Sequence, residues 1–173
     1  VEDRTRNLDA EDFFPAVNLK FAVTGSSVLR LALSRTITRP SFVEMAPFLY
    51  QESFGGTQIR GNEKLGNGYN WNADLRYEFF GSQSNDMVAA TAYFKYLDNP
   101  IERTQRLSGG AIEQTFQNAD KGIAAGIEAE LRKEIVRNLT VSGNASYIFT
   151  NVKLPESGAY TNSERSLQGA SPY

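Results

Sequence analysis

Hydrophobic and polar residues alternate with a period of two along most of this chain. In residues 29–37, Leu29, Leu31 and Leu33 lie on one side of an extended chain, and the polar side chain of Arg30 lies on the other. Similar alternation recurs in five further segments, whereas helix-period runs of comparable length are missing. We therefore predict an all-β fold of about six antiparallel, up-and-down strands, near residues 14–23, 28–37, 71–80, 87–96, 123–133 and 139–150.

The connections between these strands are alternately short and long. The short ones cover residues 25–27, 81–86 and 135–138, and the long ones cover residues 39–70, 97–122 and 151–173. In an up-and-down sheet, this alternation places every short turn at one end and every long loop at the other. Bacterial outer-membrane barrels have short periplasmic turns and long extracellular loops, and strands of about nine to eleven residues cross the membrane. The pattern favours part of a transmembrane β-barrel.

A soluble β-sandwich also has strands with one apolar face, so the alternation alone leaves that fold open. Charged polar faces, aromatic residues near strand ends and the sorted loops favour the barrel. A sandwich must cover the leucine face of residues 29–33 with a second sheet, while a barrel leaves it bare. The residues predicted to face a hydrated lumen are Arg30, Asp74, Arg76, Glu78, Glu128, Glu130 and Arg132.

The composition restricts the possible functions. The 173 residues are 40% hydrophobic and 12% aromatic, enough for one ordered domain. The 18 basic and 20 acidic residues are interspersed and give a net charge of −2, which weakens the case for nucleic-acid binding. Histidine and cysteine are absent, which excludes the usual zinc sites, thiol nucleophiles and Ser-His-Asp catalysis. We expect no enzyme activity, no cofactor, no metal site and no nucleic-acid partner.

The long loops carry the candidate ligand contacts. Arg39 precedes Pro40 where a strand ends, which favours a position at the barrel rim. Tyr69 and Trp71 could stack on a ligand ring, although an interfacial anchor is the favoured interpretation. The full set of candidates is Arg39, Tyr50, Arg60, Tyr69, Trp71, Arg103 and Arg106. No apolar stretch approaches the length of a membrane helix, and the first 14 residues lack the apolar core of a signal peptide.

Several segments resemble the barrel region of TonB-dependent outer-membrane receptors, particularly those abundant in Bacteroidetes. The resemblance is carried by LRLALSRTITRPSFVEMAPF (29–48), IRGNEKLGNGYNWNADLRYEFF (59–80), NADKGIAAGIEAELRK (118–133) and LQGASPY (167–173), and it runs from Phe13 to Tyr173. It implies a barrel of about 22 strands with a plugged lumen. Such receptors import iron chelates, cobalamin or glycans with energy relayed by TonB, and they hold the ligand with extracellular loops and the plug.

On this resemblance, the chain is expected in the outer membrane of a Gram-negative bacterium, as a plug-less fragment from the later part of a receptor barrel. Its expected partners are the rest of the barrel and plug, TonB through a preceding region, outer-membrane lipid and a small nutrient. Alone, the fragment is expected to be unable to transport, and to self-associate through open strand edges. A second function class stays open, a soluble or surface β-sheet module that binds carbohydrate through the long loops.

Overall fold

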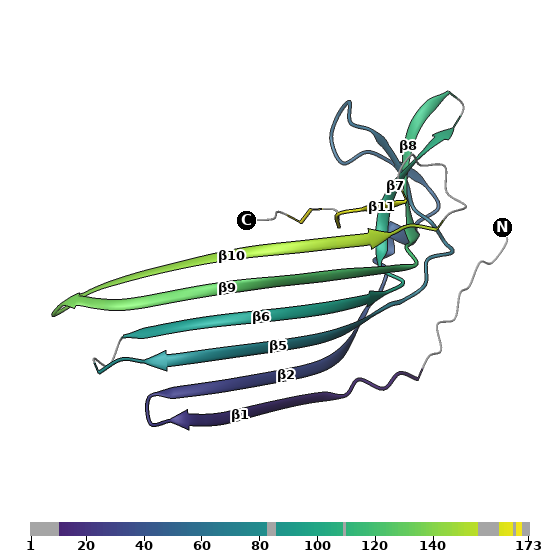
Figure 1. Cartoon of the computed structure of the whole chain (residues 1–173). Helices are drawn as coiled ribbons and strands as arrows, with labels where there is room; N and C mark the ends of the chain where they lie inside the picture. Colours follow the sequence, from purple (N-terminus) through teal and green to yellow (C-terminus); the bar gives the residue numbers. More distant parts are fainter. Residues whose placement is uncertain (1–10, 83–85, 109, 156–162, 168, 171–173) are drawn as a thin grey trace.

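The longest strands of the protein lie side by side in one sheet (Figure 1). The computed structural model describes residues 11–82, 86–108, 110–155, 163–167 and 169–170. Within these residues, six long strands follow one another in the order of the sequence, each antiparallel to the next. They are β1 (Ala16–Thr24), β2 (Ser27–Thr38), β5 (Gly68–Phe80), β6 (Met87–Asp98), β9 (Lys121–Val136) and β10 (Leu139–Lys153). This arrangement confirms the predicted all-β, up-and-down fold.

Each long strand overlaps one predicted range, and most of them extend beyond it. β9 has 16 residues and β10 has 15, so at about 3.3 Å per residue each is roughly 50 Å long. The connection between them is a two-residue turn in which Asn138 has a φ of 69°, a left-handed conformation that asparagine tolerates. A short strand, β11 (Glu164–Arg165), pairs with the far end of β10. No helix in the described part of the chain is long and apolar enough to cross a bilayer.

The register separates the sheet into two chemically different faces. The outer face carries odd-numbered residues, except in β6, where it carries even-numbered ones. One row across the outer face consists of Leu19, Leu31, Leu75, Ala92, Ile127 and Tyr147. The neighbouring row on the inner face consists of Lys20, Arg30, Arg76, Thr91, Glu128 and Ser146. Since successive side chains of a strand point to opposite faces, the outer face is mainly apolar and the inner face mainly polar along the long strands.

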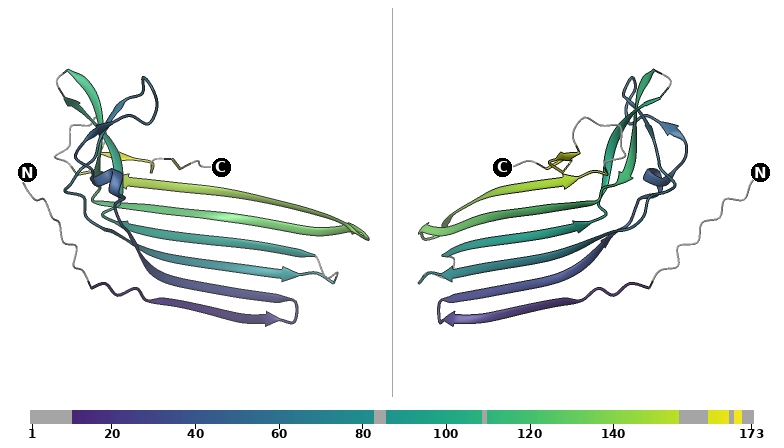
Figure 2. Two further views of the ribbon diagram at one scale, coloured as in Figure 1. Left: turned by 180° about the vertical axis from the view of Figure 1, so that it is seen from behind. Right: turned by 45° about the vertical axis from the view of Figure 1, so that its right-hand side comes forward.

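The apolar outer face is bare. Leu33 is 46% exposed and Ile127 is 63% exposed, whereas a sandwich would bury such residues. The views in Figure 2 show that the second sheet stands at one end of the long strands and does not cover this face. Among the described residues, the face is therefore left open as in the wall of a barrel, which argues against the sandwich.

A second sheet occupies the end of the long strands where the long connections lie (Figure 1). Its described strands are β3 (Leu49–Tyr50), β4 (Gln58–Arg60), β8 (Ala111–Asn118) and β7 (Ile101–Ser108), in this order, with β4 parallel to β8. A one-turn helix, α1 (Phe42–Met45), precedes β3. We refer to residues 41–66 and 101–118 together as the cap. The segments 39–70 and 97–122 were predicted as loops, but they contain these elements.

The cap has its own hydrophobic core. Ile59, Leu65 and Phe116 are buried together, and Met45, Tyr50 and Ile101 pack against them. The start of α1 is fixed by a capping box, in which the Glu44 amide donates to Ser41 Oγ (3.3 Å) and the Ser41 amide donates to Glu44 Oε2 (2.7 Å). The burial of Ile59, Leu65 and Phe116 favours folding of the cap, because it removes apolar surface from water. An irregular loop would lack this contribution.

The β7–β8 hairpin continues the β6–β9 pair beyond a bend. Only residues 99 and 100 separate β6 from β7, and only residues 119 and 120 separate β8 from β9. Asn99 has a φ of 52°, and Pro100 follows it without an amide hydrogen. The Asn118 side chain closes the bend, because its Nδ2 donates to the carbonyl oxygens of Asn99 (2.9 Å) and Gly66 (3.0 Å). The cap is thereby fixed to the long sheet.

Candidate functional site

An ion-pair ladder crosses the inner face of the long sheet. Arg30 Nε and Arg76 Nε donate to the two carboxylate oxygens of Glu78 at 2.8 and 2.9 Å. Arg76 also donates through Nη2 to Glu130 Oε2 (2.8 Å) and through Nη1 to Thr91 Oγ1 (3.1 Å). Arg30 and Arg76 are direct cross-strand neighbours, and like charges in such positions repel. Glu78 offsets this repulsion by binding both guanidinium groups.

The predicted lumen-facing residues all lie on this inner face. Arg132 extends the ladder weakly, since its Nη2 is 4.0 Å from Glu130 Oε1. Asp74 and Glu128 lie beside the ladder on the same face and take part in no ion pair among the described residues. The inner face therefore presents both signs of charge to the space in front of it.

One glycine on the inner face makes room for an aromatic ring. Tyr93 faces Gly126 across the β6–β9 pair. A Cβ atom on Gly126 would lie 2.5 Å from both Cζ and Oη of Tyr93 and 2.7 Å from the carbonyl oxygen of Tyr147. Because ordinary contacts of a Cβ are at least about 3.4 Å, only glycine allows this packing.

Two ion pairs connect the strands and loops inside the cap. Arg103 on β7 binds Glu52 with both terminal nitrogens, at 2.7 Å to Oε1 and 3.3 Å to Oε2, and its guanidinium carbon lies 5.4 Å from the centre of the Phe116 ring. Arg60 on β4 donates through Nε to Glu113 Oε1 on β8 at 2.9 Å. Glu113 is buried, and a buried carboxylate stays charged at acceptable cost only when a cation such as Arg60 binds it.

A third ion pair ties the segment after β10 to the cap. Arg165 on β11 donates through Nη2 to Glu102 Oε2 (2.8 Å) and to the Arg103 carbonyl oxygen (2.7 Å). Glu102 is buried on β7. Three segments that were predicted as separate loops are consequently held together by charged groups.

The ion pair between Glu52 and Arg103 shifts the pKa values of both side chains. The hydrogen bond from Arg103, followed by its positive charge, lowers the pKa of Glu52 below the ordinary value of 4.5. The same hydrogen bond raises the pKa of Arg103. Burial raises the pKa of the nearby Tyr50 hydroxyl, against the opposing charge of Arg103. Glu52 and Arg103 are therefore both charged at neutral pH.

The structure divides the predicted ligand contacts into groups. Tyr50, Arg60 and Arg103 come together in the cap, while Arg39 is exposed just after β2. Tyr69 and Trp71 lie on the outer face of β5, and the structure does not bring them to the cap residues. The side chain of Arg106 lies outside the described residues.

Tyr69 and Trp71 surround a residue that sequence analysis did not select. The guanidinium carbon of Arg35 lies 4.6 Å from the ring centre of Tyr69, 5.8 Å from that of Trp71 and 6.0 Å from that of Phe14. The alternation in residues 29–37 already places Arg35 on the same face as the leucines, and this signal could have identified it. We refer to Arg35, Phe14, Tyr69 and Trp71 as the Arg35 cluster.

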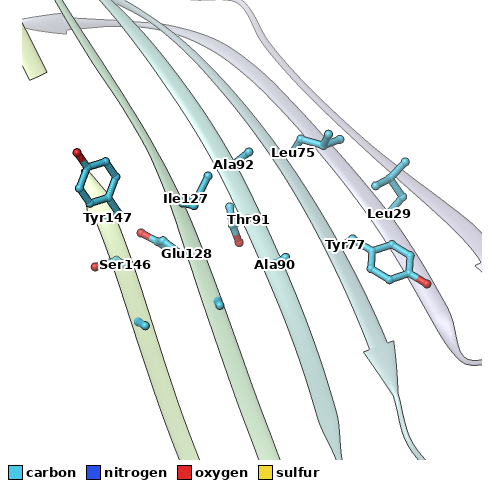
Figure 3. Close-up of a pocket in the computed structure, with 12 residues that line it drawn as sticks. Leu29, Leu75, Tyr77, Ala90, Thr91, Ala92, Ile127, Glu128, Ser146 and Tyr147 are labelled. Atoms are coloured by element: carbon cyan, nitrogen blue, oxygen red, sulfur yellow. The ribbon is translucent and has the colours of Figure 1, made fainter. Parts of the chain in front are cut away.

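The outer face also contains a shallow hollow of about 570 Å³ (Figure 3). Ala90, Ala129 and Ala145 line it and continue, on β6, β9 and β10, the row that Leu29 and Tyr77 begin on β2 and β5. Its lining is mostly apolar because it lies on the face that carries the leucines. This hollow suits hydrocarbon better than a polar ligand.

Comparison with known proteins establishes the family. The model of the outer membrane protein beta-barrel family matches residues 2–171, nearly the whole chain. The chain belongs to this family. It is accordingly located in the outer membrane, and its wall forms part of a transmembrane β-barrel. In such barrels the short turns are periplasmic and the long loops are extracellular, which places the cap outside the cell.

Solved structures of receptor barrels share the fold. The siderophore receptor PirA from Pseudomonas aeruginosa is 20% identical, with a TM-score of 0.67, over 84% of this chain and 31% of its own. The ferric enterobactin receptor PfeA from Pseudomonas aeruginosa, in complex with BCV-L6, is 20% identical, with a TM-score of 0.62, over 82% of this chain and 25% of its own. The chain thus spans about a third or less of these receptors. It matches no curated protein.

Proposed function

We propose that the chain forms part of the wall and the extracellular loops of a TonB-dependent outer-membrane receptor that imports a scarce nutrient, an iron chelate, cobalamin or a glycan. The observation that carries this proposal is the cap, a folded group of loops at the extracellular end of a barrel wall with a charged inner face. The fold shared with two siderophore receptors supports an iron chelate as the first ligand to test.

The inner face would line a hydrated lumen. Arg30, Arg76, Glu78 and Glu130 satisfy one another there, so the ladder stiffens the wall across three strand pairs. Asp74, Glu128 and Arg132 would add free or weakly paired charge toward the plug or a passing ligand. A lumen with both signs of charge holds water, which a transport path for polar nutrients needs.

In the cap, the proposal separates residues that build it from residues that meet the ligand. Arg60 and Arg103 are held by carboxylates and stabilise the cap. Arg39, Phe42 and Phe54 are exposed, so they are available to a ligand that approaches from outside. An anionic chelate with aromatic groups would find in them a positive charge and two rings.

The complete protein would act as a transporter and not as an enzyme. It would work with the remainder of the barrel, with a plug and with TonB. The bare outer face argues against the alternative of a soluble carbohydrate-binding module, because exposed Leu33 and Ile127 suit contact with lipid and not with water.

The test is uptake by the complete receptor in a strain that lacks its own copy. We expect TonB-dependent uptake of radiolabelled ferric chelates under iron limitation, reduced several-fold by Arg39→Gln combined with Phe54→Ala. Arg137→Gln, an exposed arginine in the opposite turn, is the matched control and should leave uptake unchanged. If no iron chelate, cobalamin or glycan enters through the receptor, the proposed function is wrong.

A further inference from the structure

Arg35 is a cation on the outer face, in the part of β2 that also carries the leucines. It pairs with Trp71 in the register, and Leu33 is its neighbour on the same face of β2. No carboxylate among the described residues forms an ion pair with it, and the only polar partner of its guanidinium is the Phe13 carbonyl oxygen, which accepts from Nη1 at 3.0 Å. The other basic residues of this end, Lys121 and Lys153, lie in a row that also holds acids. Among the described residues, Arg35 is thus a charge of the outer face without an ion-pair partner.

The position of Arg35 along the wall corresponds to a membrane surface. Trp71 and Phe79 are eight residues apart on β5. At about 3.3 Å per residue this is roughly 26 Å along the strand, or about 20 Å along the membrane normal for a strand tilted by about 40°. The apolar band of an outer-membrane barrel is about 25 Å tall. If Phe79 lies near the periplasmic edge of the band, Arg35 and Trp71 lie near the headgroups of the outer leaflet.

The surroundings of Arg35 prepare its guanidinium for an anion. Tyr69, Trp71 and Phe14 lie around it at 4.6 to 6.0 Å, which restricts its motion. The Tyr69 hydroxyl is itself occupied, since it donates to Asp12 Oδ1 at 2.9 Å. The Nε group of Arg35 is buried without a hydrogen-bond partner, and Nη2 has none among the described residues. A guanidinium has five N–H donors in a planar fork that matches phosphate oxygens.

We propose that the Arg35 cluster binds the phosphate group of a lipid in the outer leaflet. The phosphate would accept from Nη2 of Arg35, and the acyl chains would lie on the apolar outer face below it, where Leu33 and Phe94 are exposed. A free phosphate ion would gain only the first of these contacts. The inference depends on the membrane location of the wall and not on the transported nutrient.

The single tryptophan of the chain provides the readout, because Trp71 lies 5.8 Å from the guanidinium carbon. The chain in dodecyl maltoside micelles, which contain no phosphate, is titrated with phosphatidic acid, with diacylglycerol of the same acyl chains, and with inorganic phosphate. We expect a saturable change in Trp71 emission with phosphatidic acid only. Arg35→Gln should weaken this binding about tenfold, and Arg35→Lys should weaken it less because a charge remains without the fork.

Lys121→Gln is the matched control, since it removes a basic side chain from the same face and end of the wall, and it should leave the titration unchanged. Circular dichroism verifies that each variant is folded, and Arg35→Lys preserves the test if Arg35→Gln misfolds. An equal response to diacylglycerol, or an equal response of the Arg35 variants, overturns the proposal. A response to inorganic phosphate as strong as that to phosphatidic acid replaces the lipid site with a free-anion site and also overturns it.

Discussion

Alanine at Gly126 should destabilise the wall, whereas alanine at Gly143 should not. Both glycines lie in the β9–β10 pair, Gly126 on the inner face and Gly143 on the outer face, so the two variants make the same chemical change in neighbouring strands. A Cβ on Gly143 would meet nothing within 4 Å, while a Cβ on Gly126 would approach the Tyr93 ring and the Tyr147 carbonyl oxygen. The pair of variants therefore isolates the close contact from the general effect of replacing glycine.

The size of the effect follows from the contacts. The Cβ of Gly126→Ala would lie 2.5 Å from Tyr93 and 2.7 Å from the backbone of Tyr147, so the ring and the neighbouring strand must each move by several tenths of an ångström. Such overpacking costs about 1–3 kcal/mol. Replacing glycine by alanine at an unstrained position stabilises by about 0.4–1 kcal/mol through the unfolded chain. We expect the free energies of unfolding of the two variants to differ by about 2 kcal/mol.

The measurement is chemical unfolding in detergent micelles, followed by the emission of Trp71. The Tyr93→Leu change, combined with Gly126→Ala, should recover part of the loss, because it removes the ring but leaves the Tyr147 carbonyl in place. Equal stability of the Gly126→Ala and Gly143→Ala proteins would refute the reasoning. It would mean that the ring of Tyr93 does not lie over Gly126 in the folded wall.

Two further predictions concern the ion pairs. Arg76→Met should lower the free energy of unfolding by about 1–2 kcal/mol, because it leaves the carboxylates of Glu78 and Glu130 with fewer donors. Lys95→Met, an exposed change on the same face, is the control. Equal stability of the two variants would contradict this prediction. The lowered pKa of Glu52 means that its ion pair with Arg103 contributes fully above pH 4.5 and is lost as the pH falls through the lower pKa of the folded state. The protection of the β7 amides against hydrogen exchange, corrected for the intrinsic rate at each pH, should therefore fall at acidic pH more in the wild type than in Glu52→Gln. An identical response of both proteins would be evidence against this link.

The wall could be predicted from the sequence because its signal is local. Alternation between leucine and polar residues in 29–37 fixes both the strand and its two faces. The short connection predicted at 135–138 indicates the pairing of β9 with β10, and the structure narrows it to a turn at Arg137 and Asn138. The same alternation correctly placed Arg30 and Arg76 on one face, although it could not show that Glu78 would bind both.

The cap could not be predicted in the same way because its strands bury charge. β7 and β8 bury Glu102, Thr104 and Glu113, so they lack the usual contrast between apolar and polar residues. A Gly-Gly pair at 109–110 between two eight-residue strands is the remaining hairpin signal. The pairing of β4 with β8 joins segments more than fifty residues apart, and no short-range pattern encodes it.

The parallel pairing of β4 with β8 has a consequence for engineering. Loops of barrel proteins are commonly exchanged one at a time, on the assumption that each is an independent insertion. Here Gln58 to Arg60 of one loop lie beside Glu113 to Thr115 of the next, and the two share one core. A graft of either segment alone would leave the other with an unpaired strand edge and exposed Ile59 or Phe116. The unit that can be transplanted onto another barrel is the pair of loops together.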